Sequence, residues 1–232
     1  MSVTYLFSEA ECKQIAGSLI GMKNVWQHRY GDIFFSVGAL SYADTEGHYI
    51  DNIKKYNAIL ENNFMWAYNK IREYYQKNIE KPIRYWTQEP NPKALPGFHI
   101  FQNAKILNQN KWSAPIHTDN PEQRHAWHSE IVDIFTFTIS IKSPRAESGL
   151  RFWMDTEKLD NMPTLFDECS IEEQNTLKEE AVYIPYRIGY IYEHTGDLYH
   201  QIATEGNFNE GEMRITLQGH LAESEDFIVI YV

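Results

Sequence analysis

Two residues with metal-ligand chemistry stand two positions apart in APIHTDNPEQ, residues 114–123. In extended backbone, residues i and i+2 point to the same side of the chain. His117 and Asp119 can therefore present an imidazole and a carboxylate to one point, as a shared metal ion requires. Two polar residues after a proline are also ordinary turn chemistry, so the pair alone leaves both interpretations open.

A further histidine and an arginine follow far downstream in strand-like segments. His200 lies in GDLYHQIA, and Arg214 and Thr216 lie in EMRITLQGHL, again two positions apart on one face of an extended segment. Arg214 follows His200 by 14 residues, a spacing that suits two neighbouring strands joined by a loop. Two histidines and one carboxylate on one face of a metal ion form the facial triad of non-haem Fe(II) oxygenases.

The elements that must position these residues change character along the chain. FSEAECKQIAGSLIGM predicts a helix in which Ser8 is the N-cap and Glu11 completes a capping box. Residues 32–42 predict a strand or hairpin, and apolar residues at spacings of three and four predict a long helix over about 51–78. The four prolines of residues 80–97 predict that this segment has no regular structure.

The second half of the chain consists of short β-rich segments separated by glycine-containing turns. They are GFHIFQNAKIL, IVDIFTFTISIK, GLRFWMD, EEAVYIPYRIGYIYEH, LYHQIA, EMRITLQGHL and DFIVIYV, with a loop and a short helix predicted in MPTLFDECSIEEQNTLKE. No linker or internal repeat divides the 232 residues. We therefore expect one α+β, mostly β domain over 1–232, with helical support in 1–80 and a mostly antiparallel barrel or sandwich behind it.

The bulk composition disfavours several classes of partner. The formal net charge of −11 disfavours nucleic acids and anionic membranes, which attract basic surfaces. The two cysteines, Cys12 and Cys169, form no disulfide framework, which favours a reducing, cytoplasmic location. The start of the chain lacks the pattern of a signal peptide, and no apolar stretch is long enough to span a bilayer.

The order H-x-D … H … R-x-T within a β-rich half resembles the Fe(II)/2-oxoglutarate-dependent dioxygenase superfamily over about residues 98–222. This resemblance implies a double-stranded β-helix, a jelly-roll or cupin-like barrel. It also implies that His117, Asp119 and His200 hold Fe(II). Arg214 would pair with the distal carboxylate of 2-oxoglutarate, and Thr216 would add a hydrogen bond to the same carboxylate.

The resemblance further implies a reaction, in which 2-oxoglutarate becomes succinate and CO2 while O2 hydroxylates an unactivated C–H bond. Because family members that halogenate carry a small residue in place of the carboxylate, Asp119 disfavours halogenation. We expect a small-molecule substrate, such as a free amino acid or a natural-product intermediate. A peptide or protein side chain is the second choice, and a cupin-like barrel that binds a metal or ligand without oxidation is the third. The oligomeric state stays open.

Several residues compete for these roles. His128 and Glu130 form another His-x-carboxylate pair; we favour His117 and Asp119 because aspartate is the usual carboxylate of the resembled motif. His194 has the parity of His200, but His200 follows Gly196 and lies closer to Arg214 in sequence. Arg151 is the next choice for the cosubstrate anchor. Trp127, His128 and Phe152 are expected to line the substrate pocket, although aromatic residues more often belong to a core.

Two departures from the resembled pattern stand out. The step of 83 residues from His117 to His200 exceeds the usual separation, so residues 155–182 would form an insertion. Only one glycine, Gly149, stands in the turn of AESGLRFWMD, where the family has a pair. Both departures bear on the assignment to a subfamily more than on the resemblance to the superfamily.

Overall fold

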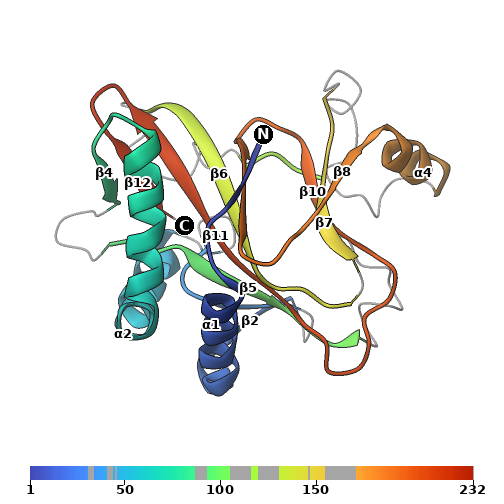
Figure 1. Ribbon diagram of the computed structural model, residues 1–232, viewed down its shortest axis with the longest axis horizontal. Helices are drawn as coiled ribbons and strands as arrows, with labels where there is room; N and C mark the ends of the chain where they lie inside the picture. Colours follow the sequence, from blue (N-terminus) through green and yellow to red (C-terminus); the bar gives the residue numbers. More distant parts are fainter. Residues whose placement is uncertain are drawn as a thin grey trace.

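The computed structural model describes residues 1–30, 34–40, 44, 46–86, 93–104, 116–119, 131–145, 147–154 and 171–231. Within these ranges the chain forms two β-sheets and three α-helices, with a short 3-10 helix at Lys23–Val25 (Figure 1). The helices are α1 (Glu9–Gly21), α2 (Glu46–Asn78) and α4 (Ile171–Glu180). None of the described helices is long and apolar enough to cross a membrane.

The large sheet has nine described strands in the order β1-β9-β6-β11-β5-β3-β2, with β12 pairing with both β11 and β4. Its strands are β1 (Ser2–Tyr5), β2 (Gln27–Tyr30), β3 (Phe34–Val37), β4 (Ile83–Tyr85), β5 (Gly97–Phe101), β6 (Ile131–Lys142), β9 (Tyr190–Thr195), β11 (Arg214–Ser224) and β12 (Ile228–Tyr231). The small sheet has the order β10-β7-β8, from β7 (Glu147–Phe152), β8 (Val182–Pro185) and β10 (His200–Glu205). All described pairings are antiparallel except β4 with β12.

The two faces of the large sheet have opposite chemistry, because side chains alternate along each strand. On β11, Ile215 and Leu217 join the main hydrophobic core, which also contains residues of α1 and α2. The alternate residues Arg214 and Thr216 face the other way, and Arg214 Nη1 donates to Thr204 Oγ1 of β10 at 3.4 Å. The polar face therefore meets the small sheet. Figure 1 shows α2 on one side of β6 and β11, and the small sheet with α4 on the other.

The N-terminal helices agree with the sequence pattern. The Ser8 hydroxyl accepts a hydrogen bond from the Glu11 backbone N–H, and the Glu11 carboxylate accepts one from the Ser8 N–H, so the predicted capping box is confirmed. Helix α2 ends at Asn78 as predicted but begins at Glu46, five residues earlier than the apolar spacing suggested. The short helix predicted before residue 180 is α4.

The strands differ from the segments expected from the sequence in three places. The proline-rich segment 80–97 contains strand β4, because Pro82 precedes the strand and leaves its three residues free to pair with β12. The sequence indicated no strand at Ser2–Tyr5, where all four residues are exposed and pair with β9. The run 179–194 is two strands, β8 and β9, separated by a turn at Gly189 with a φ of +85°. The mostly antiparallel β architecture itself is confirmed.

Candidate metal centre

A backbone bridge brings His117 and His200 together, although they are far apart in sequence. The His117 N–H donates to the His200 carbonyl at 3.0 Å, and the His200 N–H donates to the His117 carbonyl at 2.9 Å. Residues paired in this way carry their side chains on the same face of the antiparallel pair. The two imidazole centroids are 4.3 Å apart.

Asp119 completes a cluster of three potential metal ligands. Its Oδ1 lies 3.6 Å from His117 Nε2, and its Oδ2 lies 3.4 Å from His200 Nε2. One ligand atom from each of the three residues lies within 4.8 Å of the other two. The structure therefore brings together the three residues that the H-x-D … H pattern singled out. A single ion can contact all three from one side.

The protonation states of these residues suit a metal ion. His200 Nδ1 lies 2.9 Å from the Leu198 carbonyl, which can only accept, so Nδ1 carries the proton and Nε2 keeps a lone pair. Burial lowers the pKa of His200 to about 3, which keeps its imidazole neutral. Burial alone would raise the pKa of Asp119, but the surrounding imidazoles, His200 first, hold it below its ordinary value. An ionised carboxylate and a neutral imidazole are the forms that bind a metal.

A buried guanidinium lies on the same polar face. Arg214 is 2% exposed, and its guanidinium lies 4.1 Å from the centroid of the Phe101 ring. Burial lowers its pKa to about 10, so it stays charged at neutral pH. Among the described residues, Arg214 Nε and Nη2 and Thr216 Oγ1 are buried without a hydrogen-bond partner. Because unpaired buried polar groups are rare in native proteins, these three atoms indicate a site for an anion.

Sequence reasoning missed two further residues of this face. The Gln218 Nε2 atom is also buried without a partner in the described part of the chain. Tyr186 is buried beside Tyr192, and the Arg214 guanidinium opposes the burial-induced rise in the pKa of Tyr186. Gln218 has the parity of Arg214 and Thr216 on β11, so strand alternation was a usable signal for it. Tyr186 follows β8 in a turn, and no local pattern marks it.

The competing histidine and arginine have other surroundings. The His194 ring packs at 4.4 Å from the His200 ring, and its Nδ1 lies 2.9 Å from the Thr195 carbonyl, but it is not part of the three-ligand cluster. Arg151 Nη1 donates to Gln201 Oε1 at 3.0 Å. Arg151 is adjacent to Phe152 on β7, so it projects from the opposite face of the small sheet to Phe152.

Of the three residues predicted to line the substrate pocket, Phe152 lies within the described part of the chain. Phe152 is directly opposite His200 in the β7–β10 register and is 8% exposed, so it lies beside the metal-ligand cluster. Trp127, His128 and Glu130 lie outside the described residues, as does most of the predicted insertion, residues 155–170.

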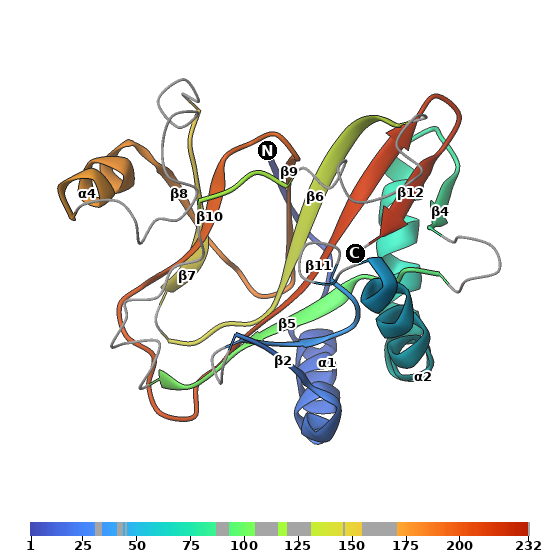
Figure 2. The ribbon, with the colours of Figure 1, turned by 180° about the vertical axis from the view of Figure 1, so that it is seen from behind.

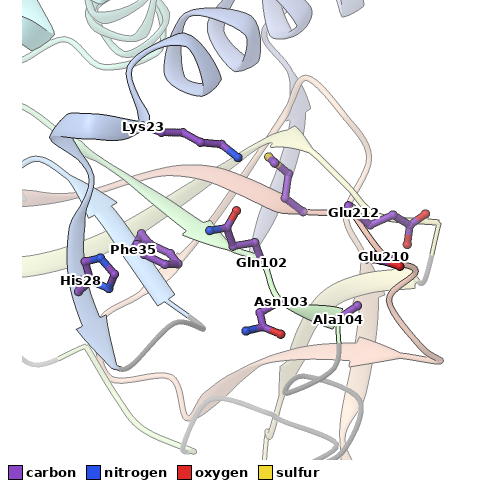
Figure 3. A pocket seen from close by; sticks show the side chains of 10 residues that line it. Lys23, His28, Phe35, Gln102, Asn103, Ala104, Glu210 and Glu212 are labelled. Atoms are coloured by element: carbon purple, nitrogen blue, oxygen red, sulfur yellow. The ribbon is translucent and has the colours of Figure 1, made fainter.

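A separate surface cavity of about 750 Å³ contains none of the three potential ligands (Figure 3). Its lining includes Lys23, Phe35, Gln102 and Met213. Met213 precedes Arg214 and belongs to the main hydrophobic core, so this cavity opens on the helix-covered side of the large sheet. The metal-ligand cluster is on the other side of the large sheet, toward the small sheet. Figure 2 shows the two sheets from behind.

Comparison with known proteins supports the fold. The sequence matches no protein-family model and no curated protein. The structure is similar to the N-substituted L-amino acid dioxygenase from Burkholderia ambifaria AMMD, solved in complex with alpha-KG, at a TM-score of 0.54 and 12% identity; the match covers 99% of this chain and 85% of that one. It is also similar to HygX from Streptomyces hygroscopicus, solved with nickel, 2-oxoglutarate and hygromycin B, at a TM-score of 0.50 and 12% identity, over 94% and 81% of the two chains. The resemblance read from the sequence is thus confirmed at the level of the fold.

Proposed function

We propose that this chain is a non-haem Fe(II)- and 2-oxoglutarate-dependent dioxygenase that hydroxylates an unactivated C–H bond of a small molecule, on a double-stranded β-helix. One observation carries the proposal. A His-Asp-His cluster and a buried arginine with two partnerless donors occur on the same polar interior of two facing sheets. The fold shared with two proteins solved with 2-oxoglutarate or alpha-KG agrees with it.

The donor set fits Fe(II). Two imidazole nitrogens and one carboxylate oxygen, with open positions opposite, are the ligands of the non-haem Fe(II) oxygenases. His117, Asp119 and His200 would hold the ion, and the Leu198 carbonyl fixes the His200 ring with Nε2 as the ligand atom. When bound there with 2-oxoglutarate and O2, the iron supplies the oxidising power for C–H hydroxylation, with release of succinate and CO2.

Arg214 and Thr216 would anchor the cosubstrate. A guanidinium offers a planar fork of donors that matches a carboxylate, and a charge-assisted pair of this kind is stronger than a neutral hydrogen bond. Arg214 Nε and Nη2 are free to donate, and the Thr216 hydroxyl stands two residues away on the same strand face. A bound carboxylate would give Arg214 Nε and Nη2 the acceptors that the described residues do not provide.

The substrate would lie beside Phe152 and the ligand cluster. Phe152 is 8% exposed, so its ring would give the bound molecule an apolar contact beside the cluster. A small molecule is supported by the kind of ligand that the two similar structures name, an N-substituted amino acid and hygromycin B. The net charge of −11 argues against a nucleic-acid substrate.

The test is succinate formation. The protein is loaded with Fe(II) and 2-oxoglutarate without oxygen, then mixed with oxygenated buffer and a panel of free and N-substituted amino acids, sugars and short peptides. We expect one panel member to stimulate succinate release above the rate without substrate, and the Asp119→Ala variant to show no release. A peptide that stimulates best would favour the side-chain hydroxylase. No succinate together with no retained iron would instead favour a barrel that binds a ligand without oxidising it.

A further inference from the structure

A row of polar side chains crosses the polar face of the large sheet. His194 of β9 is directly opposite Thr136 of β6, and Thr136 is directly opposite His220 of β11. Thr136 Oγ1 lies 2.9 Å from His220 Nδ1. His220 has the parity of Arg214 on β11, so the row is directed toward the small sheet, as the metal-ligand cluster is.

His194 is the member of this row that lies against the cluster. Its ring centroid is 4.4 Å from that of His200, at an interplanar angle of 51°. Just past the end of β9, a Cβ atom added at Gly196 would lie 2.5 Å from the Asp119 backbone oxygen. This end of β9 therefore packs against two of the three potential ligands. His194 borders the cluster without belonging to it.

The hydrogen bond of the His194 ring defines its second nitrogen. His194 is 4% exposed, and its Nδ1 lies 2.9 Å from the Thr195 carbonyl. A carbonyl only accepts, so Nδ1 carries the proton. Burial lowers the pKa of His194, which keeps the ring neutral and leaves a lone pair on Nε2. Within the described ranges, the Nδ1 contact is the one hydrogen bond of this ring.

A bare imidazole nitrogen needs a donor, which is a hydroxyl, an amine or an ammonium group. Neither a metal ion nor ionised 2-oxoglutarate carries an O–H or N–H group. The donor therefore comes from the substrate, or from water that the substrate displaces. A carboxylate or an ether has no proton to offer, and its lone pairs would face the lone pair of Nε2.

We propose that His194 Nε2 accepts a hydrogen bond from a hydroxyl or amino group of the substrate and so selects small molecules that carry this donor near the carbon that reacts. This assignment rests on the proposed function. Phe152, directly opposite His200, would contact an apolar part of the same molecule. A site that uses a buried acceptor rejects analogues without the donor, because the acceptor would stay unpaired.

The first experiment reads the protonation of His194 directly. Wild-type protein with isotope-labelled histidine is loaded with Zn(II), a diamagnetic substitute for Fe(II), and with 2-oxoglutarate. Long-range proton–nitrogen correlation spectra distinguish protonated from bare ring nitrogens, and the signals lost in His194→Phe identify His194. Amino acids, N-substituted amino acids and sugars are then added one by one. Each is paired with an analogue in which hydrogen replaces the amino group or methyl ethers replace the hydroxyls.

The second experiment measures succinate formation with Fe(II), 2-oxoglutarate and oxygen against the concentration of each panel member. It compares wild type with His194→Phe, with His194→Gln, whose side-chain oxygen restores an acceptor, and with His28→Phe. His28 is the matched control, because it lies beside Phe35 on β2 and β3 and lines the separate cavity on the other side of the large sheet. Iron content, 2-oxoglutarate binding and thermal unfolding are recorded for every variant.

We expect a bare Nε2 in the loaded wild type, and a shift of its signal with a donor-bearing panel member but not with the matched analogue. His194→Phe should raise the KM for that member about five- to a hundred-fold, because a donor in the site is left unpaired. Its iron content and 2-oxoglutarate binding should equal those of wild type. His194→Gln should recover part of the loss, and His28→Phe should match wild type.

A protonated Nε2, a panel in which no member shifts its signal, or an analogue without the donor that binds equally well would overturn the assignment. A wild-type KM or a loss of iron in His194→Phe would do the same, as would a His194→Gln variant as weak as His194→Phe. A wild-type protein that retains neither metal nor 2-oxoglutarate would instead refute the proposed function.

Discussion

Gly196 gives a sharp test of how the metal-ligand cluster is positioned. A Cβ atom added at this glycine would lie 2.5 Å from the Asp119 backbone oxygen and 3.1 Å from Ile134 Cγ2. Ordinary contact begins at 3.4 Å, so the Asp119 backbone would have to move by about 0.9 Å. Gly196 has little freedom to move instead, because its N–H donates to the Ile134 carbonyl at 2.7 Å. Gly196→Ala therefore displaces Asp119.

The displacement should weaken metal binding strongly. Metal–ligand distances tolerate about 0.2 Å, and disturbing the groups that orient a ligand typically reduces metal affinity about 10- to 100-fold. We expect Gly196→Ala to lose about 1.4–2.7 kcal/mol of metal-binding free energy.

The assay is anaerobic titration with Fe(II), or with Mn(II) followed by calorimetry. Gly17→Ala is the matched control, since Gly17 lies in α1 with open space around its Cβ position. The control should bind metal as wild type does and gain up to about 1 kcal/mol of stability from better helix propensity. Wild-type metal affinity in a folded Gly196→Ala protein would refute the claim that Asp119 is held by this close approach.

Three other perturbations follow from the structure. Arg214→Ala should raise the concentration of 2-oxoglutarate needed for half-maximal binding about a hundred-fold or more and leave one iron per chain; an unchanged requirement in a calorimetric titration would move the anchor elsewhere. Burial lowers the pKa of His99 to about 3, so between about pH 6.5 and pH 3 the unfolded chain binds a proton that the folded chain does not. The free energy of unfolding therefore decreases as the pH is lowered through this window. His99→Phe should reduce this slope near pH 5 by about 1.4 kcal/mol per pH unit in urea unfolding, and an identical slope would exclude His99 as a source. Ser8→Ala removes the α1 cap and should lower the free energy of unfolding by about 1 kcal/mol, measured the same way; no change would mean that the cap is replaced by water.

Features with local periodicity could be predicted from the sequence. His117 with Asp119, and Arg214 with Thr216, are two-residue patterns that extended backbone turns into shared faces. The capping box of α1 is equally local, because Ser8 and Glu11 lie within one helical turn. These cases need no knowledge of what packs against them.

Features set by distant partners could not be predicted. The surroundings of Tyr186 are set by Tyr192 and Arg214, which other strands carry. Strand β1 is exposed along its whole length, so only its pairing with β9 defines it. The bridge between His117 and His200 depends on the register of two segments 83 residues apart, and register is a property of the assembled sheet.

The central claim is that His117, Asp119 and His200 bind the iron that 2-oxoglutarate then joins. Equilibrium dialysis with Fe(II) without oxygen, with and without 2-oxoglutarate, tests it most directly. We predict one tightly held iron per wild-type chain, 2-oxoglutarate uptake that requires the metal, and loss of both in His117→Ala and Asp119→Ala. One retained iron per chain in both folded variants would contradict the assignment.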